Sequence, residues 1–172
     1  DAVCADCYDY AGHVVWQYYA PELWRRFTIR LRRELAGTLG MTQRAAASVV
    51  RLQFAKVAEF QRRGAVHFHA IIRLDGVHPE QSFPTPPLAV TAEHLMVAIR
   101  AAVRRTRTTA ARLPGEGSAR ILTWGKQFDV RQIVRRDGLE GSLSDRAVAA
   151  YIAKYATKAT EDLEPTGEGR DH

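Results

Sequence analysis

Two histidines separated by one residue, His67 and His69, are the side chains best suited to chemistry in this chain. They lie in GAVHFHAIIRLDG, residues 64–76, an apolar run that predicts a β-strand. Side chains alternate between the faces of a strand, so the two imidazoles share one face, about 6 to 7 Å apart, and Phe68 takes the other. Such a pair supplies two thirds of a facial metal site. The pattern predicts metal-dependent chemistry on a phosphate.

A third ligand is available on the preceding segment. Residues 49–61, VVRLQFAKVAEFQ, predict a strand that joins the histidine strand through a turn at 62–64, as an antiparallel hairpin. Glu59 and Gln61 are two residues apart, so they share one face of their strand, and they lie across the hairpin from the histidine face. Glu59 is preferred because an anionic oxygen suits a hard divalent ion, and Gln61 is the alternative. Open coordination positions would accept phosphate oxygens, so the expected cofactor is Mg²⁺ or Mn²⁺ rather than structural zinc.

A second motif, YIAKYATK at residues 151–158, lies in a helix predicted to begin with a capping box at Ser142. An apolar arc of this helix would dock on the sheet, and a neighbouring arc of roughly 100° would face the site. Lysines beside phenols can offset phosphate charge and stabilise a phenolate. For the helix taken alone, the simpler interpretation is a pair of half-buried tyrosines beside solvated lysines. The combination with the two histidines favours a catalytic role instead. The residues of the polar arc are Tyr151, Lys154, Tyr155 and Lys158.

Composition limits the class of protein. A chain of 172 residues with 46% hydrophobic and 26% charged residues suits one compact domain. The net charge of +6 and pI near 9.7 favour a polyanionic partner, with a solvated basic surface as the alternative. No segment resembles a membrane span or a signal peptide, which predicts a cytoplasmic protein without a membrane partner. Helicase activity is not expected, because the phosphate-loop motif is missing from the sequence.

Further elements follow from local signals. Pro21 is expected to open a helix that ends near the turn at 37–40, and Thr42 to cap a shorter helix through 45–47. Four prolines in residues 77–87 predict a surface loop, and a helix is expected from Thr91 through Val103. A Gly/Ser loop at 114–118 precedes a strand expected over 120–134. In that strand a core role for Trp124 and Phe128 is favoured over base stacking.

The two cysteines form a C-x-x-C at Cys4 and Cys7 with no second pair in the sequence. They are read as half of a zinc site, as a site completed by His13, or as ordinary thiols. The chain begins at Asp1 without a methionine, which we expect of an excised domain.

Together these motifs resemble a known superfamily. HFH on a strand, followed about eighty residues later by a helix with Y-x-x-K and Y-x-x-x-Y, is similar to the HUH endonucleases, the relaxases and rolling-circle initiators. The paired tyrosines resemble those of the A proteins of isometric single-stranded-DNA phages. More narrowly, KVAEFQRRGAVHFHAIIRLDG, WGKQFDVRQI and YIAKYATKATE resemble replication initiators of actinomycete rolling-circle plasmids and integrative conjugative elements.

The resemblance implies roles for individual residues. His67, His69 and Glu59 would bind the cation, and Tyr155 would attack the scissile phosphate to give a 5′-phosphotyrosine and a free 3′-hydroxyl. Tyr151 is either a second nucleophile or a support for Tyr155, and the two lysines would hold phosphate oxygens. The substrate would be single-stranded or hairpin origin DNA, with host helicase and polymerase as further partners. Expected DNA contacts are Arg62, Arg63, Arg73, Lys126 and Arg131.

The resemblance also implies an α/β (α+β) architecture, the HUH fold, with a central antiparallel sheet and flanking helices. The family's first strand carries an F-x-T-L-T type motif, and the nearest match, beginning at Phe27, sits in a helical pattern. We therefore expect that strand to be missing from this chain. The predicted organisation is a remnant of a cysteine-rich segment at 1–20, the HUH domain at 21–162 and a disordered tail at 163–172.

Two other classes of protein are retained. A hydrolase that activates water would explain the metal ligands but would leave no DNA attached to the protein. A non-catalytic DNA-binding module would explain the charge and would bind an origin without metal. A covalent protein–DNA adduct separates all three.

Overall fold

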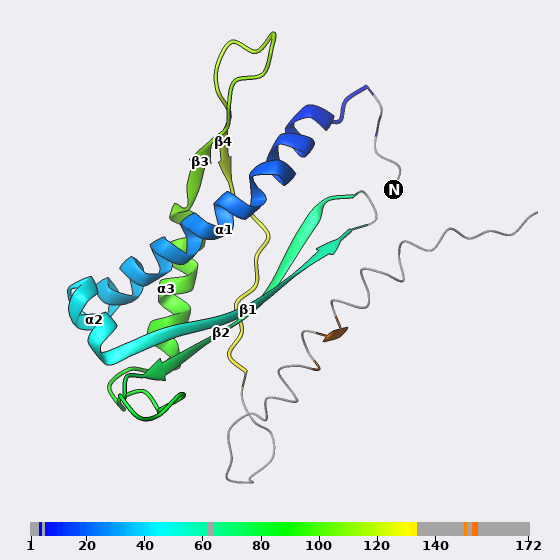
Figure 1. Cartoon of the computed structure of the whole chain (residues 1–172). Helices are drawn as coiled ribbons and strands as arrows, with labels where there is room; N and C mark the ends of the chain where they lie inside the picture. The colour runs from blue at the N-terminus through cyan, green and yellow to red at the C-terminus, as the bar shows by residue number, and fades with distance from the viewer. Residues whose placement is uncertain (1–3, 5, 62–63, 134–149, 151–152, 155–172) are drawn as a thin grey trace, which may run out of the picture. The chain divides into compact units, whose positions relative to one another are not determined.

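The structure is a computed structural model that describes residues 4, 6–61, 64–133, 150, 153 and 154 (Figure 1). The chain divides into two compact units. One unit comprises residues 1–8, 54–72 and 135–172, and the other comprises residues 9–53 and 73–134.

The first helix, α1, spans Tyr10–Thr38, so the expected start at Pro21 is wrong. Asp9 caps the helix by accepting a hydrogen bond from the Gly12 N–H at 2.8 Å. Pro21 lies inside the helix, where proline removes a backbone donor and disfavours the preceding turn. The expectation rests on the preference of proline for the first position of a helix.

Tertiary contacts hold the part of α1 that precedes Pro21. The indole N–H of Trp16 donates to the Thr123 carbonyl at 2.9 Å. The Tyr19 hydroxyl accepts from the Ala111 N–H, also at 2.9 Å. Both partners lie about a hundred residues away in the chain, so packing outweighs the cost of an internal proline.

The next two helices match their sequence signals. Helix α2, Gln43–Val49, is capped by Thr42, and helix α3, Ala92–Arg105, is capped by Thr91. Helix α1 packs against α3 and α2 and against two short strands, β3 (Arg107–Thr109) and β4 (Ile121–Thr123). Figure 1 shows α1 in blue crossing α3 in green. The expected helices at 42 and 91 are therefore confirmed.

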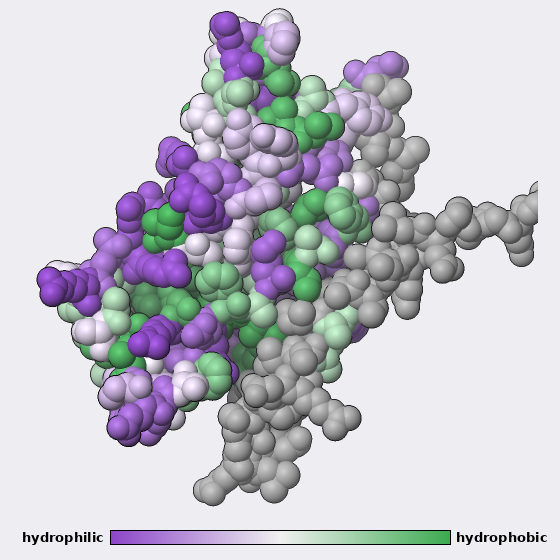
Figure 2. Space-filling model, in the orientation of Figure 1, coloured by the Kyte–Doolittle hydropathy of each residue, from purple (hydrophilic) through white to green (hydrophobic). Residues whose placement is uncertain are grey.

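The core of this unit lies along one side of α1. Leu23 and Leu31 are its largest fully buried side chains, and Leu23 packs against Ala110 and Leu122. Trp124 joins this cluster, with its ring 6.0 Å from that of Trp16, so the favoured core role of Trp124 is confirmed. Phe128 is 39% exposed, so the core role favoured for this residue is wrong. On the outer side of α1, hydrophilic residues alternate with small apolar patches (Figure 2).

Two long strands form an antiparallel ribbon, β1 (Val50–Phe60) and β2 (Val66–Gly76), as the hairpin pattern predicts (Figure 1). After β2 the proline-rich segment 77–87 is irregular and mostly exposed, as expected. Its far end is held near β2, because the Gly76 N–H donates to the Pro84 carbonyl at 2.7 Å. The Arg73 guanidinium lies 4.9 Å from the Phe83 ring centre and adds a second contact.

The strand expected over 120–134 is largely wrong, because only Ile121–Thr123 is a strand. Its partner β3 is three residues long and pairs Thr108 with Leu122, so the ladder offers no hydrogen bonds beyond Thr123. The described residues form two separate two-stranded sheets, β1–β2 and β3–β4, rather than one central sheet. The class is α+β with antiparallel sheets. In the described residues no helix is long and apolar enough to cross a membrane.

Candidate metal site

The histidine motif lies within strand β2, as expected. The rings of His67 and His69 are stacked, with centroids 4.9 Å apart and planes inclined by 15°. Alternation along the strand accounts for their shared face, because residues two apart point the same way. Because the two rings are this close on one strand, each can direct a nitrogen toward the same metal ion.

Strand β1 brings two polar side chains to the same face. Glu59 Oε2 lies 2.7 Å from His69 Nε2, and Gln61 Nε2 lies 3.0 Å from His67 Nδ1. The side chains of His69 and Glu59 are 18% and 12% exposed, so their contact is largely shielded from solvent. Parity therefore delivers all four side chains to one face of the ribbon.

The opposite face of the same ribbon is apolar in character. Lys56 Nζ lies 4.0 Å from the ring centre of Phe68, the residue between the two histidines. Burial lowers the pKa of Lys56, because the charged ammonium loses water. The two faces of the hairpin thus differ in chemistry, with imidazole and carboxyl groups on one and an aromatic ring under an ammonium on the other.

The donor set fits a divalent cation in type. Ligand atoms bound at about 2.1 Å and at right angles lie roughly 3 Å apart, close to the spacing between Glu59 Oε2 and His69 Nε2. Across the described residues, however, no three His, Cys, Asp or Glu side chains are grouped closely enough to hold a metal ion. The side-chain amide of Gln61 contacts the other imidazole, that of His67. The three predicted ligands stay a prediction.

The other predicted site residues fall in different places. Lys126 is exposed, and the exposed Lys154 is helical. Arg131 forms an ion pair with Asp129 at 2.5 Å, with both side chains largely in solvent. The predicted residues that lie outside the described part of the chain are Arg62, Arg63, Tyr151, Tyr155 and Lys158.

Arg73 has a partner that sequence reasoning missed. Its Nε and Nη2 atoms lie 2.7 and 3.1 Å from the two carboxylate oxygens of Asp75, which is only 4% exposed. The forked contact holds the guanidinium in one orientation. A signal was present, because residues 73 and 75 are two apart on a strand and share a face.

The two cysteines interact with each other. Cys4 and Cys7 are both exposed and free. A hydrogen bond from the Cys7 thiol lowers the pKa of Cys4 and raises that of Cys7. Zinc ligation by this pair, with or without His13, stays a prediction, as does the assignment of residues 1–20 to a cysteine-rich remnant.

Comparison with known proteins gives a consistent result. The family model described as "Replication initiator protein, pSAM2" (RepSA) matches residues 1–171. A replication initiator protein of Streptomyces ambofaciens is 48% identical over 156 residues, which cover 90% of this chain. The chain spans about a third of the length of that relative. No solved structure matches.

Proposed function

This chain belongs to the family of pSAM2-type replication initiator proteins, and on that premise we propose that it nicks origin DNA through a tyrosine nucleophile in rolling-circle replication. The observation that carries the proposal is the group of polar side chains on one face of the β1–β2 ribbon. Glu59 contacts His69 there, and His67 stacks on the same ring. A facial His/His/carboxylate set leaves positions for phosphate oxygens.

The proposed reaction is a transesterification. The Tyr155 hydroxyl oxygen bonds to the scissile phosphorus, and the bond from phosphorus to the 3′ oxygen breaks. The proton lost by the phenol balances the proton gained by the leaving 3′ oxygen. The products are a 5′-phosphotyrosine and a free 3′-hydroxyl that can prime synthesis, and no nucleotide cofactor is consumed.

The histidine face would supply the ligands for this step. His67, His69 and either Glu59 or Gln61 would hold Mg²⁺ or Mn²⁺, an ion that polarises the phosphate and offsets charge in the transition state. Lys154 and Lys158 would bind phosphate oxygens, and Tyr151 would serve as a second nucleophile or support Tyr155. Exposure of Lys154 to solvent is compatible with such a contact.

The substrate and partners follow from the chemistry. The scissile strand would enter single-stranded, as from an extruded origin hairpin, and a released 3′-hydroxyl would call for a host polymerase and helicase. Predicted backbone contacts remain Arg62, Arg63, Arg73, Lys126 and Arg131. For Arg73 the contact with Asp75 leaves 48% of the side chain exposed, enough for a phosphate to approach.

The test is a covalent-adduct assay. The protein is incubated with Mn²⁺ and labelled single-stranded oligonucleotides that tile the replication origin of its element, and products are separated on a denaturing gel. We expect a slow band that needs metal and disappears in Tyr155→Phe and His69→Ala. The Tyr151→Phe lane reports on the second tyrosine.

Two results would contradict nicking through tyrosine. Cleavage without an adduct in any lane would favour a hydrolase that uses activated water. Binding without cleavage, unaffected by metal, would favour a DNA-binding module.

A further inference from the structure

Helix α3 carries a basic face that the nicking proposal does not use. Its buried residues Leu95 and Ala98 face the core. On the other side, within an arc of about 100° at 100° per residue, lie Val97, Arg100, Ala101 and Arg104. These residues line a shallow groove of about 350 Å³ together with Arg105.

Among the described residues, two of the three arginines in this groove have no carboxylate partner. Arg105 donates to Glu34 of α1 at 2.5 Å, and that contact raises the pKa of Arg105. Neither Arg100 nor Arg104 forms an ion pair with any described residue. Arg107 at the start of β3 is exposed and likewise unpaired among the described residues.

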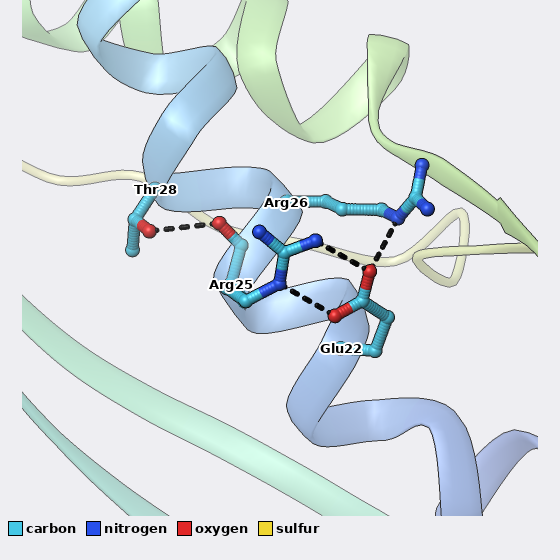
Figure 3. A network of polar contacts seen from close by, with 4 residues as sticks. All are labelled: Glu22, Arg25, Arg26 and Thr28. Carbon is cyan, nitrogen blue, oxygen red and sulfur yellow. Dashed lines mark hydrogen bonds and ion pairs between the residues drawn. The ribbon is translucent and has the colours of Figure 1, made fainter.

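Two arginines of α1, Arg25 and Arg26, provide a contrast. Figure 3 shows the guanidinium groups of Arg25 and Arg26 directed at one carboxylate, that of Glu22, at 2.6 and 2.7 Å. Their charge is partly compensated within the helix. Arg100 and Arg104 lie one turn apart with the same charge, a spacing that destabilises a helix. The helix dipole favours arginine in the last turn, at 104 and 105, but Arg100 lies before it.

The lining of the groove limits what can bind. Two guanidinium groups one turn apart suit an anion with repeated charges. The surface between them is aliphatic, from Val97, which is 43% exposed, and Ala101. No aromatic side chain lines it, so it has no platform for stacking unpaired bases. Phosphates of a duplex backbone meet these conditions.

We infer that the face of α3 formed by Arg100 and Arg104 binds the phosphate backbone of duplex DNA, with residues other than those proposed for nicking. The inference rests on the proposed DNA partner but not on metal or tyrosine chemistry. Its effect would be sequence-independent affinity that falls steeply with salt.

The test compares two double variants of equal net charge, Arg100→Gln with Arg104→Gln, and Arg25→Gln with Arg26→Gln. Fluorescence anisotropy measures affinity for a random-sequence duplex and for a single strand of equal length, over a range of salt. Losing two phosphate contacts lowers the slope of log affinity against log salt by about 2. Between 50 and 200 mM salt, the fall in duplex affinity should then be roughly tenfold smaller for the α3 variant than for wild type.

Each outcome decides the matter. The inference is supported if the α3 variant shows this change on duplex DNA and the α1 variant does not. It is overturned if the duplex slope stays at the wild-type value, if both variants change equally, or if only single-strand binding falls.

A second readout separates this inference from the nicking proposal. On a short single-stranded oligonucleotide at saturating protein, the α3 variant should still form the covalent adduct. His69→Ala should lose the adduct and keep its duplex affinity. Loss of the adduct in His69→Ala together with an unchanged slope in the α3 variant would leave nicking supported and overturn the inference about α3.

Discussion

Glu59 Oε2 on β1 lies 2.7 Å from His69 Nε2 on β2, so a carboxylate and an imidazole meet across the hairpin on the face that also carries His67. Ten residues separate the pair in the chain, and strand alternation alone brings them to one side. A hydrogen bond of this kind fixes the orientation of an imidazole ring before any ion binds.

Removing one imidazole should weaken cation binding strongly. We expect His69→Ala to weaken Mn²⁺ binding by at least about 100-fold, because even changes to outer-shell partners of metal ligands cost about 10- to 100-fold. Isothermal titration calorimetry with Mn²⁺ alone measures this. His78→Ala, in the exposed loop after β2, is the matched control and should bind like wild type. Equal Mn²⁺ affinity in His69→Ala and wild type would rule out a metal role for this face.

Two substitutions identify the third ligand. If Glu59 binds the ion, Glu59→Gln should weaken Mn²⁺ binding by about 10- to 100-fold and Gln61→Ala by less. The same titration measures both variants. A larger loss in Gln61→Ala would assign the position to the amide that contacts His67.

The core of α1 should be sensitive to truncation. Leu23 is 0% exposed and packs against Ala110 and Leu122, so Leu23→Ala should lower the free energy of unfolding by about 2 to 5 kcal/mol. Leu88→Ala, at a side chain 99% exposed, should change it by less than about 0.5 kcal/mol. Urea denaturation followed by tryptophan fluorescence gives both values. Similar losses in the two variants would contradict this placement of the core.

Acid should weaken the Glu22 cluster. Hydrogen bonds from Arg25 and Arg26 lower the pKa of Glu22 to about 2, against roughly 4.3 in an unfolded chain. A depressed folded pKa contributes stability that is present above the unfolded pKa and is lost as pH falls toward 2. The arginine side chains are 59% and 48% exposed, so the effect should be small.

The comparison with Glu22→Gln isolates this effect. Urea denaturation of both proteins at pH 5 and at pH 2.5 should show the wild-type advantage shrinking toward the lower pH. An advantage that grows on acidification would contradict the assignment.

Local signals predicted the elements that they control. Thr42 and Thr91 mark the starts of α2 and α3 because a side-chain oxygen next to helical residues satisfies free N–H groups. Period-two alternation predicted the β1–β2 ribbon and the shared face of His67 and His69. The metal-binding role of these two histidines and the nucleophile role of Tyr155 stay predictions.

Long-range packing explains what local signals missed. The first eleven residues of α1 form a helix despite Pro21, because Trp16 and Tyr19 contact chain segments about a hundred residues away. Strand β4 ends at Thr123 because its partner is short, and alternation in the sequence beyond that point carries no information about a partner. Neither the early start of α1 nor the end of β4 can be predicted from the ten or so residues around it.

The loop after β2 has a practical use. Its base is closed, since Gly76 donates to Pro84 and a side chain added at Gly76 would meet the Thr85 carbonyl at 2.5 Å. Residues 78–82 between these points are all exposed. A short peptide tag inserted after Pro79 would lengthen a segment whose ends are already held together, at little entropic cost. The loop thus provides a place to attach a fluorophore, with which the proposed binding to DNA could be followed one molecule at a time.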